Sequence, residues 1–340
     1  LAAVVILYVA GVLIYSSISA FKPDHKEDAE IINSEKPFTI IRDSLRLMTW
    51  NIGYAGLGEE MDFFYEGGRK VRPDSKLSIK YFNGIKFFIK DNNYIDFILL
   101  QEVDFDSKRS YGLNEFKNLS ETLPEFAAIR AVNYKAAYVP VPWLNPMGRV
   151  ESGLATFSRY QPREAVRLAT PGNYSWPKSL YLLKRCILFT RYKVEGKGDL
   201  VLMNIHNSAF DDADKLREAE MGMIREIAVK EFENGNFVVI GGDWNQSPPG
   251  WDDRFEHGYV QQTVWPLPAT YMPQGWHCAF DPSIPTNRDV TEPFDKTTTK
   301  TTILDYFVVS PNIEIMDVKT VDLQFEYSDH QPVLLNLILK

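Results

Sequence analysis

Three residues with hard oxygen ligands, Asn51, Glu102 and Asp329, stand at or near the ends of short apolar runs in this sequence. Carboxylate and amide oxygens suit Mg²⁺ and Mn²⁺, whereas zinc sites draw mainly on cysteine and histidine. No cysteine and histidine cluster accompanies them, because the chain has only two cysteines, Cys186 and Cys278. Mg²⁺ also keeps several waters and takes further oxygens from a substrate phosphate. The sequence therefore predicts a Mg²⁺ site, with Mn²⁺ as the alternative ion.

A second set of side chains could transfer protons and stabilise negative charge. His330 has candidate carboxylate partners in Asp305 and in its neighbour Asp329, and His206 supplies another imidazole. Such groups can orient a water molecule and stabilise an anionic, phosphorane-like state. Asp305 is the hardest to explain structurally, because a carboxylate in so apolar a segment is costly to bury without a partner. Each of the others alone has a structural explanation, so it is the whole set that indicates a site.

Short apolar runs must position these side chains. Runs of four to eight residues rich in leucine, isoleucine and valine are typical of buried strands. The segments TTILDYFVVS and SDHQPVLLNLILK are also strand-like. If neighbouring strands end at the same edge of a sheet, their terminal polar residues converge. The runs LRLMTWN, DFILLQE, DLVLMNIH and FVVIGGDWN end, in order, at Asn51, at Glu102, at His206, and at Asp243 and Asn245.

Apolar residues at helical spacing predict two helices between these strands. Strands mixed with a few helices favour an α/β sandwich, and we predict one catalytic domain over residues 44–340. The first helix rests on Leu77, Tyr81, Ile85 and Phe88, and the second on Leu216, Ala219, Met223 and Ile227, with Asp211 or Asp212 as its N-cap and Gly235 just past its end.

Six motifs occur in a fixed order: TWNI at 49–52, LLQEVD at 99–104, NIHN at 204–207, GGDWN at 241–245, ILDYFVVS at 303–310 and SDHQPV at 328–333. Together they resemble the endonuclease/exonuclease/phosphatase superfamily, which includes DNase I-like nucleases, bacterial sphingomyelinases and inositol polyphosphate 5-phosphatases. The resemblance covers roughly residues 44–340. It implies a DNase I-like four-layer α/β (α+β) sandwich and metal-assisted hydrolysis of a phosphoester.

The resemblance also implies a role for eight residues. None of these motif residues is missing, so a degenerate, non-catalytic relative is not expected. Glu102 matches the principal metal ligand, with Asn51 beside it and Asp329 next to the metal; Asp243 and Asn245 match the pair at the attacking water and the phosphate; His330 matches the histidine at the scissile phosphate, Asp305 the aspartate that orients it, and His206 the imidazole that stabilises the transition state.

The first 21 residues, LAAVVILYVAGVLIYSSISAF, carry no charge. About 20 apolar residues at 1.5 Å each can cross a hydrocarbon core of roughly 30 Å. We therefore predict a membrane-anchoring transmembrane helix in residues 1–21, a polar tether in 22–43 and a catalytic domain outside the cytoplasm. The alternative is a cleaved signal segment and a secreted protein, because Ser17, Ser19 and Ala20 are small enough for a cleavage site.

The net charge of the chain indicates which kinds of partner it can bind. The formal net charge is -8 and the isoelectric point is about 5.3, which disfavours a protein that binds nucleic-acid backbones. A local basic patch can coexist with an acidic whole, so nucleic acid stays an alternative partner. We expect a monomer whose partner is a phosphoester substrate.

Several loops could contact the substrate, but each has an alternative interpretation. The insertion 53–74 could cover the site and bring basic residues to a phosphate, as could SKRSYG at 107–112, or both could be solvated surface. The loops 138–148, 173–183 and 264–276 place tryptophans near the surface, for ligand or membrane contact or as small local cores. The residues concerned are Arg69, Lys70 and Arg72 in the insertion, and Trp143, Trp176, Trp265 and Trp276 in the aromatic loops.

Three functions remain open. The first is an extracytoplasmic phosphodiesterase or phosphatase for a lipid headgroup or small phosphoester, favoured by the uncharged N-terminus, the acidic charge and the aromatic loops. The second is a surface or secreted Mg²⁺-dependent nuclease, which needs a basic groove. The third is a surface binding module with an inactive site.

Overall fold

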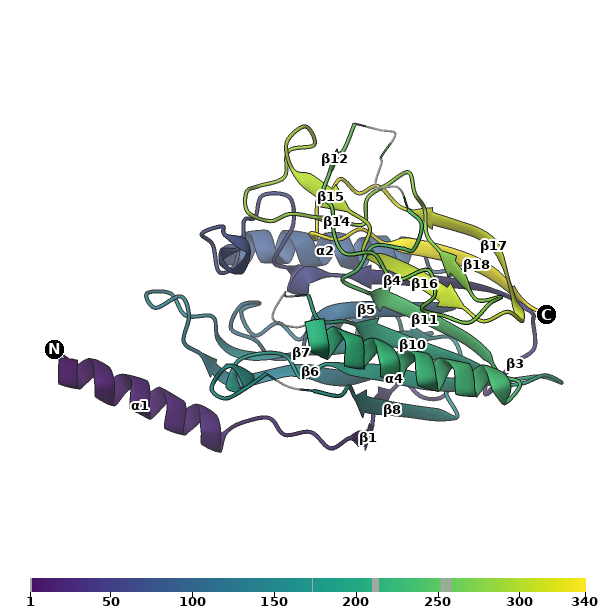
Figure 1. Cartoon of the computed structure of the whole chain (residues 1–340), viewed down its shortest axis with the longest axis horizontal. Helices are drawn as coiled ribbons and strands as arrows, with labels where there is room; N and C mark the ends of the chain where they lie inside the picture. The colour runs from purple at the N-terminus through teal and green to yellow at the C-terminus, as the bar shows by residue number, and fades with distance from the viewer. Residues whose placement is uncertain (1, 173, 210–213, 252–254, 256–257) are drawn as a thin grey trace.

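Two large β-sheets make up most of the protein (Figure 1). The structure is a computed structural model that describes all residues except 1, 173, 210–213, 252–254 and 256–257. Within these residues the eight-stranded sheet contains β1 (Lys26–Asp28), β3 (Thr39–Ile40), β8 (Glu164–Ala169), β9 (Cys186–Val194), β10 (Leu200–His206), β11 (Phe237–Asp243), β13 (His277–Ala279) and β16 (Asp305–Val309). The seven-stranded sheet contains β2 (Glu30–Ile32), β4 (Ser44–Asn51), β5 (Phe97–Asp104), β6 (Ala127–Val139), β7 (Gly148–Ser158), β17 (Ile313–Thr320) and β18 (Val333–Leu339).

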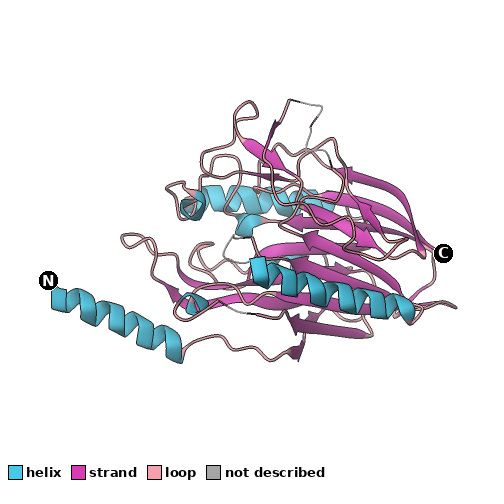
Figure 2. Cartoon of the chain, viewed as in Figure 1, coloured by secondary structure: helices cyan, strands magenta, loops and turns pink. Residues whose placement is uncertain are grey.

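Helices and short connections complete the described elements (Figure 2). The helices are α1 (Ala2–Ile18), α2 (Ser75–Asp91), α3 (Glu115–Thr122) and α4 (Asp214–Glu233). Single 3₁₀ turns lie at η1 (Gly53–Ala55), η2 (Phe64–Glu66) and η3 (Lys178–Leu180). A small sheet joins β12 (Val260–Gln261), β15 (Lys300–Thr302) and β14 (Asn287–Arg288).

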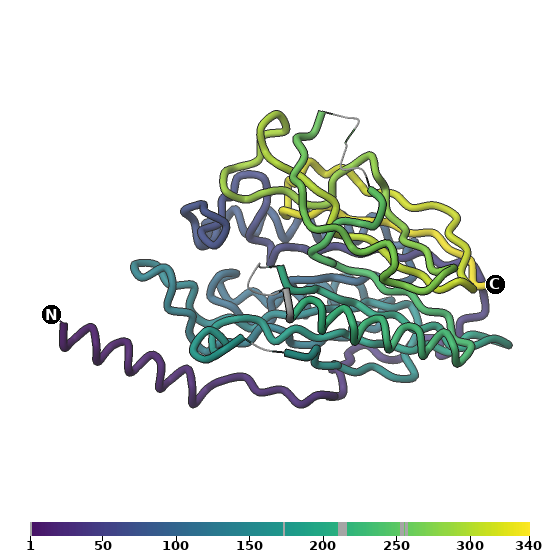
Figure 3. The backbone as a smooth tube through the Cα atoms, in the orientation of Figure 1, coloured from purple at the N-terminus to yellow at the C-terminus, as the bar shows by residue number. Residues whose placement is uncertain are grey.

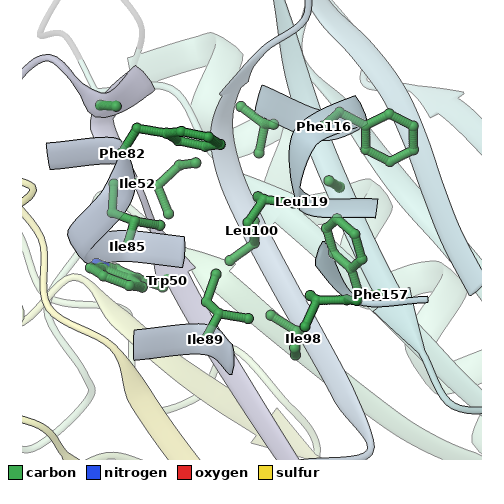
Figure 4. Close-up of a cluster of buried hydrophobic side chains, with 14 of the residues drawn as sticks. Trp50, Ile52, Phe82, Ile85, Ile89, Ile98, Leu100, Phe116, Leu119 and Phe157 are labelled. Atoms are coloured by element: carbon green, nitrogen blue, oxygen red, sulfur yellow. The ribbon is translucent and has the colours of Figure 1, made fainter. Parts of the chain in front are cut away.

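Three apolar clusters fix the order of the layers. One, with Leu47 and Leu202 among its members, joins strands of the two large sheets and is the core between them. A second packs α2 and α3 on the seven-stranded sheet, where Figure 4 shows Phe82 and Ile85 facing Leu100. The third packs α4 on the eight-stranded sheet. The layers therefore run helix, sheet, sheet, helix, and the prediction of a mixed α/β fold is confirmed.

Parallel strand pairs bring the predicted strand ends together. β4 runs parallel to β5, and β10 runs parallel to β11 with His206 opposite Asp243. β16 is antiparallel to β11 and begins with Asp305, which lies opposite Asp243. Because β11 also contacts β4 and β5 across the core, these strand ends meet at one end of the two sheets. The predicted convergence is confirmed.

Both predicted helices are present. The first is α2, whose Asp74 side chain caps it by accepting a hydrogen bond from the Leu77 N–H at 2.9 Å. The second is α4, and Gly235 follows it with a positive φ of 84°, as expected for a residue that ends a helix. The predicted N-caps of α4, Asp211 and Asp212, lie outside the described residues.

The N-terminal segment differs from its prediction. Its helix, α1, has 17 residues. In the described part of the chain, no helix is both long and apolar enough to cross a membrane, which corrects the prediction of a transmembrane anchor. Figure 3 shows α1 at one side of the molecule, where it contacts β6 of the seven-stranded sheet.

Residues 22–43 also differ from the predicted tether. They contain three short strands: β1 pairs with β8, β2 with β6, and β3 with β9. Ala29 and Ile31 pack against the apolar cluster around Leu154 and Leu188. Strands of two or three residues are too short to show an alternating pattern, so the polar composition hid their place at the sheet edges.

Candidate active site

One pocket of about 330 Å³ gathers the predicted site residues. Six of the eight line it directly, and the remaining two, Asn51 and Asp305, are hydrogen-bonded to residues that do. The structure therefore brings together residues that are up to 279 positions apart in the chain. The six lining residues are Glu102, His206, Asp243, Asn245, Asp329 and His330.

His330 is paired with Asp305 inside the protein. The His330 Nδ1 and Asp305 Oδ2 atoms are 2.7 Å apart, and Asp305 is fully buried. Burial alone would lower the pKa of His330, but the charges of Asp305 and Asp243 raise it well above its usual value. Asp305 therefore favours the charged form of the His330 imidazole. His330 lines the pocket, and its Nε2 lies 3.7 Å from the Asp243 Oδ2.

Asp243 lies at the centre of the cluster. Its Oδ1 accepts a hydrogen bond from the Asn245 N–H at 2.9 Å, and its Oδ2 accepts one from the Asn51 Nδ2 at 3.1 Å. Burial, with the nearby Asp305, raises the pKa of Asp243 to about 6 despite the opposing charge of His330. A carboxylate with a pKa near 6 is suited to accept a proton at neutral pH.

His206 is a buried neutral imidazole. Its Nε2 lies 3.5 Å from the Asp243 Oδ2, and its Nδ1 has no hydrogen-bond partner within the described residues. Burial lowers its pKa well below the usual value, and the charge of Arg185 adds to this effect. Arg185 itself lines the pocket and donates to the His206 carbonyl at 3.1 Å. The neutral ring can donate a hydrogen bond to a substrate oxygen.

Unusual backbone geometry aims two of these residues. Glu102 has a φ of +53° and lies where the β5–β7 register shifts between Leu100 and Val103. Such a bulge turns a side chain out of the regular alternation, and this one directs Glu102 to the pocket. Asn245 has the same φ of +53°, and its Nδ2 donates to the Asn207 carbonyl at 2.7 Å. Strained residues of this kind tend to occur at functional sites.

The two carboxylates predicted to bind metal lie close enough to influence each other. Burial raises the pKa of Asp329 to about 6, and the charge of Glu102 contributes in the same direction. An all-oxygen donor set with mutually repelling charges fits a divalent Mg²⁺ or Mn²⁺ ion. Asn51 directs its Nδ2 to Glu102 at 3.3 Å, while its Oδ1 accepts from the Gly53 N–H at 3.0 Å. The ligand role of Asn51 therefore stays a prediction.

Among the described residues, the group of three with metal-ligand spacing is not the pair predicted to bind the metal. Ligand atoms of Asp243, Asp305 and His330 lie within 4.8 Å of one another. Because Asp305 and His330 are hydrogen-bonded to each other, we interpret this group as the proton-transfer part of the site. Glu102 and Asp329 remain the candidate metal ligands.

The sequence interpretation missed two residues of the pocket wall, Asn287 and Arg288. The Asn287 Nδ2 lies 3.0 Å from the His330 Nε2, and the following residue, Arg288, is 1% exposed. The guanidinium of Arg288 donates to the carbonyls of Leu57, Gly58 and Met61, which fixes the 53–74 segment beside the site. A polar triplet, NRD at 287–289, is the only signal in the sequence.

The two predicted basic loops differ in whether their basic residues line the pocket. Phe63, Tyr65 and Glu66 of the 53–74 segment line the pocket, but its basic residues do not. Arg72, for example, donates to the Asn145 side chain at 2.8 Å. In SKRSYG, by contrast, Arg109 does line the pocket, although it is buried and paired with a carboxylate.

The aromatic loops are mostly exposed, as predicted. Trp143, Trp176 and Trp265 are each more than half exposed, whereas Trp276 packs on Phe232 of α4. Trp143 also contacts Tyr8 of α1, with ring centroids 4.9 Å apart. Two of these loops therefore lie close to the N-terminal helix, since the Trp176 Nε1 is 3.4 Å from the Ser17 hydroxyl.

Comparison with known proteins assigns the family. The model of the Endonuclease/Exonuclease/phosphatase family matches residues 48–330, so the chain belongs to this family, as its motifs predict. Members of the family are phosphoester hydrolases and generally use a divalent metal. No curated protein shows significant similarity to the chain.

Solved structures share the fold at low identity. An endonuclease/exonuclease/phosphatase from Beutenbergia cavernae is 18% identical with a TM-score of 0.53, and the match covers 88% of this chain and 72% of that one. D. rerio TDP2 complexed with a single-strand DNA product is 12% identical, with a TM-score of 0.53 over 86% and 98% of the two chains. ANGEL2, a 2',3'-cyclic phosphatase, is 14% identical, with a TM-score of 0.55 over 92% and 98%. At these identities the likeness establishes the fold alone.

Proposed function

We propose that this protein is a Mg²⁺- or Mn²⁺-dependent hydrolase of phosphoester bonds. The observation that carries the proposal is the buried set formed by Asp243, His330 and Asp305, next to the carboxylates of Glu102 and Asp329 in one pocket. This set combines a proton acceptor, an imidazolium and a candidate metal site. Membership in the endonuclease/exonuclease/phosphatase family supports the same reaction class.

The residues divide the reaction between them. Asp243, held by the Asn245 N–H and the Asn51 amide, accepts a proton from the attacking water. The imidazolium of His330, fixed by Asp305, stabilises the charge that develops on the phosphoryl oxygens, and neutral His206 donates a further hydrogen bond. Glu102 and Asp329 would hold the metal ion, which would supply Lewis-acid stabilisation of the phosphoryl oxygens.

The pocket walls favour a small phosphoester or a lipid headgroup as substrate. Tyr54, Phe63 and Tyr65 on one segment and Met147 and Leu183 on others line the same cavity as the catalytic set. Apolar and aromatic walls with a few convergent polar groups are typical of sites for compact ligands. The net charge of -8 is a further argument against an extended nucleic-acid backbone.

A nuclease is the alternative, because TDP2, which shares the fold, has been captured with a single-strand DNA product. In this case too Asp243 and His330 carry the chemistry, but the pocket must admit a polynucleotide.

We also propose that the enzyme acts outside the cytoplasm, on the basis of the uncharged N-terminal segment. Fractionation of cells that produce the full chain, with protease accessibility of intact cells, tests this location.

A substrate panel on the full chain tests the function. Phospholipids, sphingomyelin, inositol phosphates, nucleotides and plasmid DNA are incubated with Mg²⁺ or Mn²⁺, then again after EDTA. We expect turnover of a small or lipid phosphoester that EDTA abolishes and added metal restores. Cleavage of DNA alone identifies the nuclease. Full activity without metal contradicts the metal role, and a lack of turnover with every substrate favours a binding module.

A further inference from the structure

Part of the pocket wall has no role in the proposed reaction. Tyr54, Arg109 and Asn133 line the same cavity as Glu102 and His206 but come from different segments. Tyr54 is 1% exposed and Asn133 is 2% exposed. Within the described residues, neither the Tyr54 hydroxyl nor the Asn133 Nδ2 has a hydrogen-bond partner. Buried polar groups are almost always hydrogen-bonded, so two unpaired donors in one pocket indicate a missing ligand.

The backbone at Tyr54 adopts an energetically unfavourable conformation. Gly53, Tyr54 and Ala55 have φ values of 51°, 43° and 47°, all in the left-handed region. For a residue other than glycine this conformation costs about 1–3 kcal/mol. Gly56 makes the turn possible, because a Cβ there would lie 2.4 Å from the Tyr54 ring. Strain retained beside a catalytic cluster indicates that the position of the Tyr54 ring matters for function.

A buried ion pair supports the ring. The guanidinium of Arg109 lies 3.5 Å from the centroid of the Tyr54 ring. Its Nε and Nη2 both donate to Asp104, so the positive charge is compensated within the protein. Burial raises the pKa of Tyr54 well above its usual value, so the phenol stays protonated and remains a hydrogen-bond donor. The ring is thus fixed between Arg109 and Gly56.

A second bulge places Asn133. The β6–β7 register shifts between Val132 and Tyr134, which leaves Asn133 without a partner across the strands. Val132 pairs with Gly153 of β7, and so does Val103 of β5 beside the Glu102 bulge. A Cβ at Gly153 would lie 2.0 Å from the Ala131 carbonyl oxygen. One glycine therefore accommodates two bulges, one for a candidate metal ligand and one for Asn133.

We propose that Tyr54 and Asn133 form a donor subsite that binds a phosphoryl oxygen of the substrate, an inference that rests on the proposed phosphoester hydrolysis. Both residues line the cavity that also holds the candidate metal ligands, and each has a buried donor without a partner among the described residues. A phosphoryl oxygen is the acceptor common to every substrate of that reaction class, and hydrogen bonds to charged oxygens are the strong ones. The oxygen belongs either to the scissile phosphate or to a second phosphate on the same substrate.

Calorimetric binding of inorganic phosphate and pyrophosphate to the Mn²⁺-loaded full chain tests the proposal. Tyr54→Phe removes the hydroxyl but keeps the ring on Arg109, and Asn133→Asp replaces the amide donor by an acceptor of the same shape. Tyr192→Phe is the matched control, since Tyr192 is fully buried in the core between the sheets and does not line the pocket. Mn²⁺ binding and thermal unfolding of each variant are measured in parallel.

We expect Tyr54→Phe to weaken anion binding by about 10- to 100-fold, the effect of losing one hydrogen bond to a charged group. Weaker binding of both anions assigns the subsite to the scissile phosphate, and weaker binding of pyrophosphate alone assigns it to a second phosphate. Wild-type binding of both anions by Tyr54→Phe and Asn133→Asp overturns the proposal.

The two proposals fail separately in this design. Tyr54-dependent anion binding without any metal-dependent turnover leaves the donor subsite in place and contradicts the hydrolase. Metal-dependent turnover with kcat and KM unchanged in Tyr54→Phe leaves the hydrolase in place and contradicts the subsite.

Discussion

The two sides of the pocket are built in different ways. On the first side, regular strands deliver Asp243, His206 and Asp305 at their ends, and the sheet register alone sets them opposite one another. On the second side, a left-handed turn and a bulge aim Tyr54 and Asn133. The proton-transfer residues therefore depend on the regular part of the fold. Glu102, near the end of β5, belongs to the same catalytic side although a bulge directs it to the pocket. Irregular backbone, which can vary without loss of the sheets, is available to select the substrate.

The largest expected effect lies on the strand-end side. Glu102→Gln keeps the size of the side chain but removes the charge that a divalent ion needs. We expect kcat to fall by about 10³-fold or more for every substrate, because loss of metal assistance removes several kcal/mol of transition-state stabilisation. Steady-state kinetics with added Mg²⁺ measures this.

The control is Glu121→Gln, an equivalent change on the exposed surface of α3, for which wild-type kinetics are expected. If Glu102→Gln affected one substrate and spared another, the separation between a general catalytic side and a selective side would be wrong.

A smaller effect is expected at the turn that joins the two sides. Gly53 has a φ of 51°, and a Cβ there would lie 2.8 Å from the Asp329 Oδ1. Gly53→Ala should therefore lower the free energy of unfolding by about 1–3 kcal/mol and also displace a candidate metal ligand. We expect weaker Mn²⁺ binding together with the loss of stability.

Gly196→Ala separates the two consequences. Gly196 has a φ of 66°, but a Cβ there would meet no atom within 4 Å. Gly196→Ala should therefore lower the free energy of unfolding by about 1–2 kcal/mol and leave metal binding unchanged. Equal Mn²⁺ affinity in Gly53→Ala and wild type would show that the turn does not connect the two sides.

The strand-end side could be predicted from sequence because regular structure has a regular pattern. An apolar run that stops at Asn51 or His206 marks both a strand and the position of its last residue. Parallel pairing then brings such ends to one edge. The prediction of a transmembrane helix was wrong because the apolar composition of residues 1–21 does not show where the helix ends, which is at Ile18. The alternative of a cleaved signal segment stays a prediction.

The donor side could not be predicted in the same way. Asn133 stands inside the 13-residue strand β6, where only the bulge, a property of three-dimensional pairing, turns it to the pocket. In the sequence, nothing distinguishes Arg288 from an exposed arginine. In the structure it is buried and hydrogen-bonded to backbone carbonyls of the 53–74 segment. Burial of a charged side chain depends on carbonyls that are more than 200 residues away in the chain.

The smallest expected effect concerns His206, whose burial lowers its pKa well below 6.5. Above pH 7 the ring is neutral in both the folded and the unfolded state. As the pH falls below about 6.5, the unfolded chain takes up a proton at His206 that the folded protein excludes, so the contribution of His206 to the free energy of unfolding decreases by up to about 1.4 kcal/mol per pH unit. Asp243 and Asp329, whose pKa burial raises to about 6, take up protons in the folded protein and contribute in the opposite direction. Urea unfolding of the EDTA-treated protein between pH 7 and 5 measures this slope. His206→Gln, which cannot titrate, should reduce the slope, whereas His277→Gln, at an exposed position of β13, should retain it. An unchanged slope in His206→Gln would mean that the strand-end side admits a charged imidazole at position 206, and the proposed role of a neutral donor there would then have to be abandoned.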